Sequence, residues 1–247
     1  MKKSKLTMLM LAWVTIFSMS FIVSGCGKKY QEIALYKYSE NTDGTLTITG
    51  LTDKGRSEYE LVVPSELDGK KVTVIGDGAI RDDVIVKKVV INTGVEYIGS
   101  NAFLSCYNLE DIEIPETIMD IGTNAFTETA WKTTQFADSK EIIINNVLYE
   151  ADASRTEYDI KDGVVTIASG VFYNNTTVSK VHIPATVKNI GTYAFSGCKS
   201  LTELELPDGL ESIGYGAFAK SGIKEIKIPG SVKSIGQDAF LGIEKVQ

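Results

Sequence analysis

The chain has 247 residues, 43% of them hydrophobic, with 25 basic and 32 acidic side chains. Beyond residue 25 the balance is 22 basic to 32 acidic, a net charge of −10, which argues against a nucleic-acid surface built from clustered Lys and Arg and disfavours polybasic membrane docking. One histidine and three widely separated cysteines remove most histidine-based metal sites, the usual catalytic triads and a disulfide framework.

The N-terminal segment has the layout of a secretory signal. A lysine-rich start at residues 2–5 precedes an apolar run over residues 6–23, as in the n-region and h-region of signal peptides. The Val-Ser-Gly-Cys sequence at 23–26 resembles the lipobox of bacterial lipoproteins at all four positions. This resemblance implies that residues 1–25 are removed as a signal peptide. It also implies that the thiol of Cys26 carries a diacylglyceryl group, whose two acyl chains form a stable anchor.

An uncleaved transmembrane helix is the alternative interpretation of this segment, because eighteen mostly apolar residues nearly span a bilayer. In both interpretations the rest of the chain lies outside the cytoplasm. The lipoprotein interpretation predicts a lipid-anchored (palmitate-type) protein on the extracytoplasmic face of the cell membrane. Residues 26–29 would then be a lipidated tether, too short to act as a flexible stalk.

Residues 30–71 are predicted to form N-terminal capping strands. Asp43-Gly44 makes a turn before the alternating sequence Leu46–Ile48, and Leu61–Pro64 reads as a strand that ends in proline. Turn residues followed by alternation are typical of a hairpin.

A hexapeptide, Ile-Gly-x-x-Ala-Phe, recurs along the remaining chain. Five full and two looser copies begin at positions 75, 98, 121, 167, 190, 213 and 235. The steps between them are 23, 23, 46, 23, 23 and 22 residues, so we predict one degenerate copy hidden between 127 and 163. A period held over about 160 residues indicates a stack of equivalent coils.

A second element precedes most hexapeptides. Segments such as Leu109–Pro115 and Leu201–Pro207 alternate apolar with polar residues and end in proline. The alternation is typical of a strand with one buried face, and proline ends such a strand because it has no N–H for the ladder. One unit cannot bury its apolar face alone, whereas stacked units form a continuous core.

These motifs resemble the BspA-like leucine-rich repeats of bacterial surface proteins, whose units read approximately L-x-x-I-x-I-P-x-x-V-x-x-I-G-x-x-A-F. The resemblance covers residues 72–247. It implies a right-handed, β-rich solenoid with parallel strand ladders and short helical turns. It further implies surface binding or adhesion to a protein or glycan rather than catalysis, with no cofactor.

Two regions depart from the repeat. Residues 127–163 lose the hexapeptide and contain Trp131 and a strand-like run, Glu141–Tyr149. We interpret them as a degenerate coil with a protruding hairpin, which either bends the coil or presents a binding surface, or is a spacer without function. After Phe240 only a partial strand remains. An uncovered last coil invites pairing with another chain, so the alternative function is a self-associating component of the cell envelope.

The outward strand positions are the candidate binding residues, because parallel stacking sets equivalent positions side by side in two columns. Seven acids and three lysines make this face predominantly acidic. It is either a docking strip for a basic partner or an ordinary solvated face. In register, the positions are Lys88 and Val90, Asp111 and Glu113, Glu157 and Asp159, Lys180 and His182, Glu203 and Glu205, Glu225 and Lys227.

The remaining candidates for chemistry have structural interpretations. Cys106 and Cys198 share one repeat position, four periods apart. The stack therefore separates them by about 19 Å, too far for a disulfide, and local backbone bonding or core filling is expected of both. His182 lies on the polar side of its strand, and a lone histidine there predicts no metal site.

Overall fold

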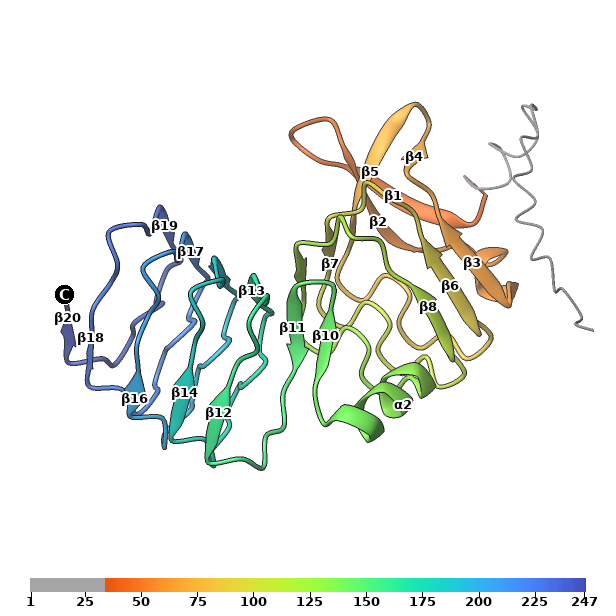
Figure 1. Cartoon of the computed structure of the whole chain (residues 1–247). Helices are drawn as coiled ribbons and strands as arrows, with labels where there is room; N and C mark the ends of the chain where they lie inside the picture. Colours follow the sequence, from red (N-terminus) through yellow and green to blue (C-terminus); the bar gives the residue numbers. More distant parts are fainter. Residues whose placement is uncertain (1–33) are drawn as a thin grey trace, which may run out of the picture.

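A computed structural model describes residues 34–247 (Figure 1). The expected signal peptide 1–25, the lipidation site Cys26 and the tether 26–29 lie outside the described residues. Within residues 34–247, no helix has both the length and the apolar character needed to cross a bilayer.

The described chain starts with an antiparallel hairpin. Strands β1 (Tyr36–Glu40) and β2 (Leu46–Leu51) pair across the turn predicted at Asp43-Gly44. The 3-10 helix η1 (Gly55–Ser57) follows. A second antiparallel pair follows further along the chain, formed by β4 (Glu66–Leu67) and β5 (Lys70–Ile75). Because β5 also pairs in parallel with β2, these hairpins lead directly into the stacked coils.

Each following coil contributes strands to two ladders, which makes the molecule a solenoid (Figure 1). The first ladder carries the isoleucine of the hexapeptide. In the first half of the described chain, up to β9, it runs β1-β2-β5-β7-β9, and in the second half, from β10 onward, it runs β10-β11-β13-β15-β17-β19. Apart from the antiparallel pairs β1-β2 and β10-β11, its pairs are parallel. The new strands are β7 (Tyr97–Ile98), β9 (Asp120–Ile121), β10 (Ile142–Ile144), β11 (Val147–Glu150), β13 (Thr166–Ile167), β15 (Asn189–Ile190), β17 (Ser212–Ile213) and β19 (Ser234–Ile235).

The second ladder carries the alternating segments. In it the middle residues, such as Ile112 and Val181, are buried while their neighbours are exposed, as strand alternation requires. The predicted β-rich solenoid with parallel ladders is therefore confirmed. The strands are β3 (Glu60–Val63), β6 (Lys88–Ile91) and β8 (Asp111–Glu113), then β12 (Glu157–Asp159), β14 (Lys180–His182) and β16 (Glu203–Leu204), and last β18 (Glu225–Ile226) and β20 (Lys245–Val246).

The Ala-Phe turns build the core between the ladders. Phe172, Phe195 and Phe218 stack along the axis with ring centroids 5.1 and 5.3 Å apart. Phe103 and Phe126 form a similar stacked pair in the first half, at 5.4 Å. Backbone bonds between coils hold these turns together, for example the Phe195 N–H that donates to the Ala217 carbonyl at 2.7 Å.

The two described cysteines are part of this core. Cys106 and Cys198 are free and buried, and each thiol donates to a backbone carbonyl, of Ile80 at 3.1 Å and of Phe172 at 2.9 Å respectively. Burial raises the pKa of both thiols to about 12. The expectation of core filling with backbone bonding, and without a disulfide, is confirmed.

The expectation for residues 127–163 needs correction. They contain an α-helix, α2 (Ala130–Ser139), which the sequence reasoning did not predict. The Thr129 hydroxyl caps this helix by accepting from the Lys132 N–H at 3.0 Å. A hairpin is present, but the expectation that it protrudes is wrong, because Ile142 and Val147 are buried and β11 pairs in parallel with β13. β11 thus occupies the place of the hidden coil.

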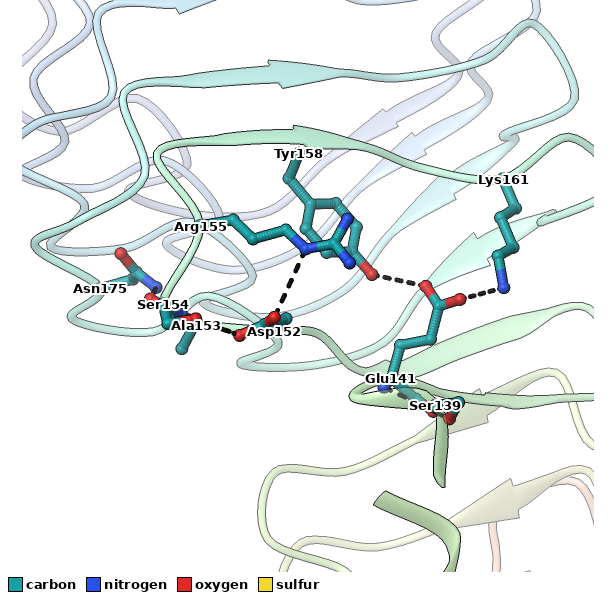
Figure 2. A network of polar contacts seen from close by, with 9 residues as sticks. All are labelled: Ser139, Glu141, Asp152, Ala153, Ser154, Arg155, Tyr158, Lys161 and Asn175. Atoms are coloured by element: carbon teal, nitrogen blue, oxygen red, sulfur yellow. Dashed lines mark hydrogen bonds and ion pairs between the residues drawn. The ribbon is translucent and has the colours of Figure 1, made fainter. Parts of the chain in front are cut away.

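Polar contacts and aromatic packing join the two halves at this point. The Tyr149 hydroxyl accepts from the Phe126 N–H at 2.9 Å, in place of a backbone carbonyl of a regular coil. Figure 2 shows the carboxylate of Glu141 between two partners from the second half: it accepts from the Tyr158 hydroxyl at 2.7 Å and pairs with Lys161. These contacts tie the end of α2 to β12, so the irregular segment continues the stack.

Candidate functional site

The predicted acidic face, formed by the outward strand positions, is here called the acidic strip. The second half of the solenoid assembles most of it. In the β12-β14-β16 ladder, Glu157 lies beside Lys180 and Lys180 beside Glu203, while Asp159 lies beside His182. All five side chains are exposed. The two expected columns therefore exist here, with Glu205 directly after β16 continuing the second column.

The strip does not extend across the junction as expected. Asp111 and Glu113 belong to the separate β3-β6-β8 ladder, because helix α2 occupies the part of the chain where a strand between β8 and β12 would lie. Both carboxylates are bound by Lys88, at 3.1 and 2.5 Å. The bonds to Glu113 and Asp111 raise the pKa of Lys88. Placing these two acids in one strip with Glu157 and Asp159 was wrong.

Two adjoining shallow depressions lie on the strip in the second half. One, of about 530 Å³, is lined by Lys180, His182, Glu203, Glu205 and Asp208 together with apolar neighbours. The other, of about 330 Å³, shares Glu205 and Asp208 and adds Glu225 and Lys227. The strip residues that the second half brings together are therefore Glu157, Asp159, Lys180, His182, Glu203, Glu205, Glu225 and Lys227.

The charges in these depressions are only partly compensated. Lys180 pairs with Glu203 at 3.0 Å, and the bond raises the pKa of the lysine. Glu225 pairs with Lys245 at 2.6 Å. Within residues 34–247, neither Glu205 nor Asp208 has an ion-pair partner. Carboxylates of this kind attract cationic groups and accept hydrogen bonds from them. Across the same residues, no three potential metal-ligating side chains gather.

Sequence reasoning missed a third depression, of about 460 Å³, on the first ladder. Tyr97, Met119 and Asp120 line it from the first half. From the second half come the polar residues that directly precede the repeat isoleucines, namely Thr166, Asn189, Ser212 and Ser234. Burial raises the pKa of Asp120 to about 6, against bonds from the Ile121 N–H and the Ser169 hydroxyl that lower it. The position of Asp120 directly before a repeat isoleucine was the sequence signal that could have placed it on this surface.

Asp120→Asn is expected to stabilise the protein at pH 7 and to leave its stability unchanged below about pH 4. Between pH 4 and 6 the unfolded chain loses this proton first, so ionisation of Asp120 lowers the free energy of unfolding as the pH rises. The expected gain is about 1 to 2 kcal/mol, below the full value of the shift because the side chain keeps some contact with water. Urea unfolding at pH 4 and pH 7 measures it.

Asp43→Asn is the matched control for this prediction. The Thr45 hydroxyl and N–H both donate to Asp43 and lower the pKa of its carboxyl. Its contribution to stability is therefore present above about pH 4 and is lost as the pH falls, so this substitution should act with the opposite sign. Equal responses of the two variants to pH would contradict the assignment of Asp120.

Comparisons with known proteins agree with this architecture. A family model described as "BspA type Leucine rich repeat region" matches residues 73–199 and 165–247, in six copies. A search of curated proteins gives no match.

Several solved structures are similar to this chain. A leucine-rich repeat protein of T. pallidum is 25% identical, with coverage of 75% of this chain and 86% of that one and a TM-score of 0.43. A leucine-rich cell surface protein of Faecalibacterium prausnitzii is 20% identical, covering 86% and 74%, with a TM-score of 0.40. The pneumococcal vaccine antigen PcpA is 16% identical, covering 81% and 75%, with a TM-score of 0.39. Because the family model spans well over half of the sequence, the chain belongs to the BspA-type leucine-rich repeat family.

Proposed function

We propose that this chain is a bacterial cell-surface lipoprotein, anchored through acylated Cys26, whose solenoid binds a macromolecular partner by adhesion and catalyses no reaction. Solenoids of this family are typically non-catalytic scaffolds for protein interaction. The observation that carries the proposal is the pair of adjoining depressions in which Glu205 and Asp208 stand without ion-pair partners among residues 34–247.

Charge and geometry favour a basic partner. The ladder holds its outward side chains about 4.8 Å apart, so several carboxylates meet one partner surface at once. A field of one sign speeds the encounter with an oppositely charged surface. Lys180 and His182 also line the larger depression, and because their side chains can donate hydrogen bonds, they favour partners that also present an acceptor.

The binding experiment uses the mature chain purified in detergent against a panel of extracellular-matrix proteins and cell-wall glycans. We expect saturable, salt-sensitive binding that weakens at least tenfold when Glu203, Glu205 and Glu225 are changed to Lys. The control carries the same charge change at Glu60, Glu110 and Glu116, which are exposed in the first half. Equal binding by both triple variants would exclude the acidic strip as the binding site.

The anchor is tested separately with Cys26→Ser. We expect this variant to leave the membrane fraction and to lose incorporation of labelled fatty acid, because the thiol is the acylated atom. If the variant stays in the membrane, and neither it nor the parent chain incorporates the label, the lipoprotein proposal is contradicted and an uncleaved helix is favoured.

A second candidate function is self-association in the cell envelope. In the last described coil, Ile235, Leu241 and Val246 are exposed, and exposed apolar residues beside a strand edge promote pairing with another chain. Concentration-dependent oligomers that Ile235→Lys abolishes, together with no binding to the panel, would favour this function over adhesion.

A further inference from the structure

The second ladder is interrupted between β16 and β18 (Figure 1). In the described part of the chain, β12, β14 and β16 form one sheet and β18 and β20 form another, and β16 does not pair with β18. Around the same coils the first ladder is continuous, because β15 pairs with β17 and β17 with β19. The coils therefore stay stacked although two adjacent strands of the second ladder are unpaired.

The interruption coincides with a shortened turn. The stretch Phe218–Ile223 is one residue shorter than its equivalent one coil earlier, Phe195–Leu201. Gly222 lies in the shorter turn, and a Cβ atom placed on it would lie 2.2 Å from the carbonyl oxygen of Lys199. The shortened turn is therefore drawn against the preceding coil, and the unpaired strand β18 follows directly after it.

The open edge of β16 presents free backbone groups. The Glu203 N–H donates to the Ser179 carbonyl of the preceding coil. Backbone groups of successive strand residues point to opposite edges, so the N–H and C=O of Leu204 point toward the following coil. Within residues 34–247, β16 has no strand partner on that side. An edge of this kind is a template for pairing with another strand.

A depression of about 330 Å³ lies along this edge. Its lining includes Leu204 and Leu206 from one side of the interruption and Ile226 from the other. Leu204 and Leu206 are only partly buried, whereas the equivalent residues one coil earlier, Val181 and Ile183, are 3% and 5% exposed. The interruption therefore leaves backbone groups and apolar side chains open at the same place.

We propose that the open edge of β16 binds an extended peptide segment of the partner by strand addition, with lysine or arginine at alternate positions and apolar residues between them. This proposal rests on the proposed function of the acidic strip, and it names the class of partner as a protein with an exposed basic strand. Strand addition to a free edge takes its affinity from main-chain hydrogen bonds and its specificity from alternate side chains.

The two faces of an added strand meet different surroundings, because strand side chains alternate between the faces of a sheet. On the inner face, apolar residues of the segment cover Leu204 and Leu206. Glu205 and Asp208 line both depressions and have no ion-pair partner within residues 34–247. Basic residues of the segment supply the missing cations, and opposite charges on neighbouring strands stabilise the pairing.

The free backbone groups favour a peptide over a small cation. A polyamine would neutralise Glu205 and Asp208, but it has no carbonyl group to accept from the Leu204 N–H. Each residue of a peptide other than proline offers one main-chain donor and one acceptor. A peptide therefore satisfies the carboxylates and the strand edge together.

The test measures binding of a fluorescent eight-residue peptide of alternating lysine and valine to the mature chain by anisotropy. Two further peptides carry N-methyl groups, one on the valine amides and the other on the lysine amides. We expect saturable binding of the parent peptide. One methylated peptide should bind at least tenfold more weakly and the other like the parent, because a strand edge uses the amides of alternate residues.

Charge is tested on the protein. The double variant Glu205→Gln with Asp208→Asn removes two charges and keeps the shape of both side chains, so we expect at least tenfold weaker binding of the parent peptide. The matched control is Glu110→Gln with Glu116→Gln, at two exposed acids of the first half. This control should bind the peptide like the parent chain.

Three results would overturn the proposal: no saturable binding of the parent peptide, equal binding of the parent and both methylated peptides, or equal loss of binding with both methylated peptides. The proposed function fails separately. A chain that binds a matrix protein through the acidic strip but ignores the peptide refutes only strand addition. Peptide binding that survives both methylations but is lost in the double variant likewise supports the acidic strip and refutes strand addition alone.

Discussion

Phe195→Ala is expected to lower the free energy of unfolding by about 3 to 5 kcal/mol, as for large aromatic truncations in well-packed cores. Phe195 is completely buried. Its ring lies between those of Phe172 and Phe218, with interplanar angles of 9° and 1°. Truncation therefore opens a cavity between two coils, and in a solenoid each coil is held chiefly by its neighbours. Urea unfolding followed by circular dichroism measures the loss.

Phe240→Ala provides the comparison for this prediction. Phe240 is only partly buried and stacks on one ring, that of Phe218, at 5.7 Å. Its truncation should cost no more than about half as much, because water reaches the site and fewer contacts disappear. Equal losses for the two variants would mean that stacking on both sides does not determine the stability of a coil.

The regular coils were predictable because their signals are local. The spacing of Ile190 and Ile213, and the alternation around Val181 and Leu204, identify strands, and a constant period places them side by side. No long-range information is needed when every coil repeats the same pairing.

The junction was less predictable because its structure depends on distant contacts. Helix α2 carries no regular apolar stripe, and it is positioned where Trp131 and Phe136 pack on the first core cluster. The adjoining run Ile142–Ile144 indicates a strand but has no alternation to say which face is buried. Pairing of β11 with β13 decides that question, and this pairing lies outside any local sequence window.

The candidate surfaces also divide into a part that the repeat predicts and a part that it does not. The acidic strip was predictable through Glu157, Lys180 and Glu203, because these share one repeat position, and it failed only across α2. The contact between the exposed side chains of Tyr193 and Tyr215, whose ring centroids lie 5.2 Å apart, was missed because the two residues occupy different positions of the hexapeptide, so aligning the repeats does not bring them together. The available signal was a tyrosine where other coils place glycine, asparagine or aspartate.

Gly214→Ala should be nearly as damaging as loss of a core ring, although it adds only a methyl group. A Cβ atom on Gly214 would lie 2.6 Å from the carbonyl carbon of Gly191 and the amide nitrogen of Thr192 in the preceding coil. Both are backbone atoms, which cannot turn away as a side chain does. The Gly214 N–H donates to the Ile190 carbonyl at 2.7 Å, so relief of the clash also stretches this bond.

We expect Gly214→Ala to lower the free energy of unfolding by about 3 kcal/mol, at the upper end of overpacking effects. Gly230→Ala is the matched control, because a Cβ atom there meets nothing within 4 Å, and it should change stability by less than about 0.5 kcal/mol. Urea unfolding of both variants measures the difference. Similar values would show that the coils separate at little cost, and the close approach of their backbones would then not be what makes glycine necessary after the repeat isoleucine.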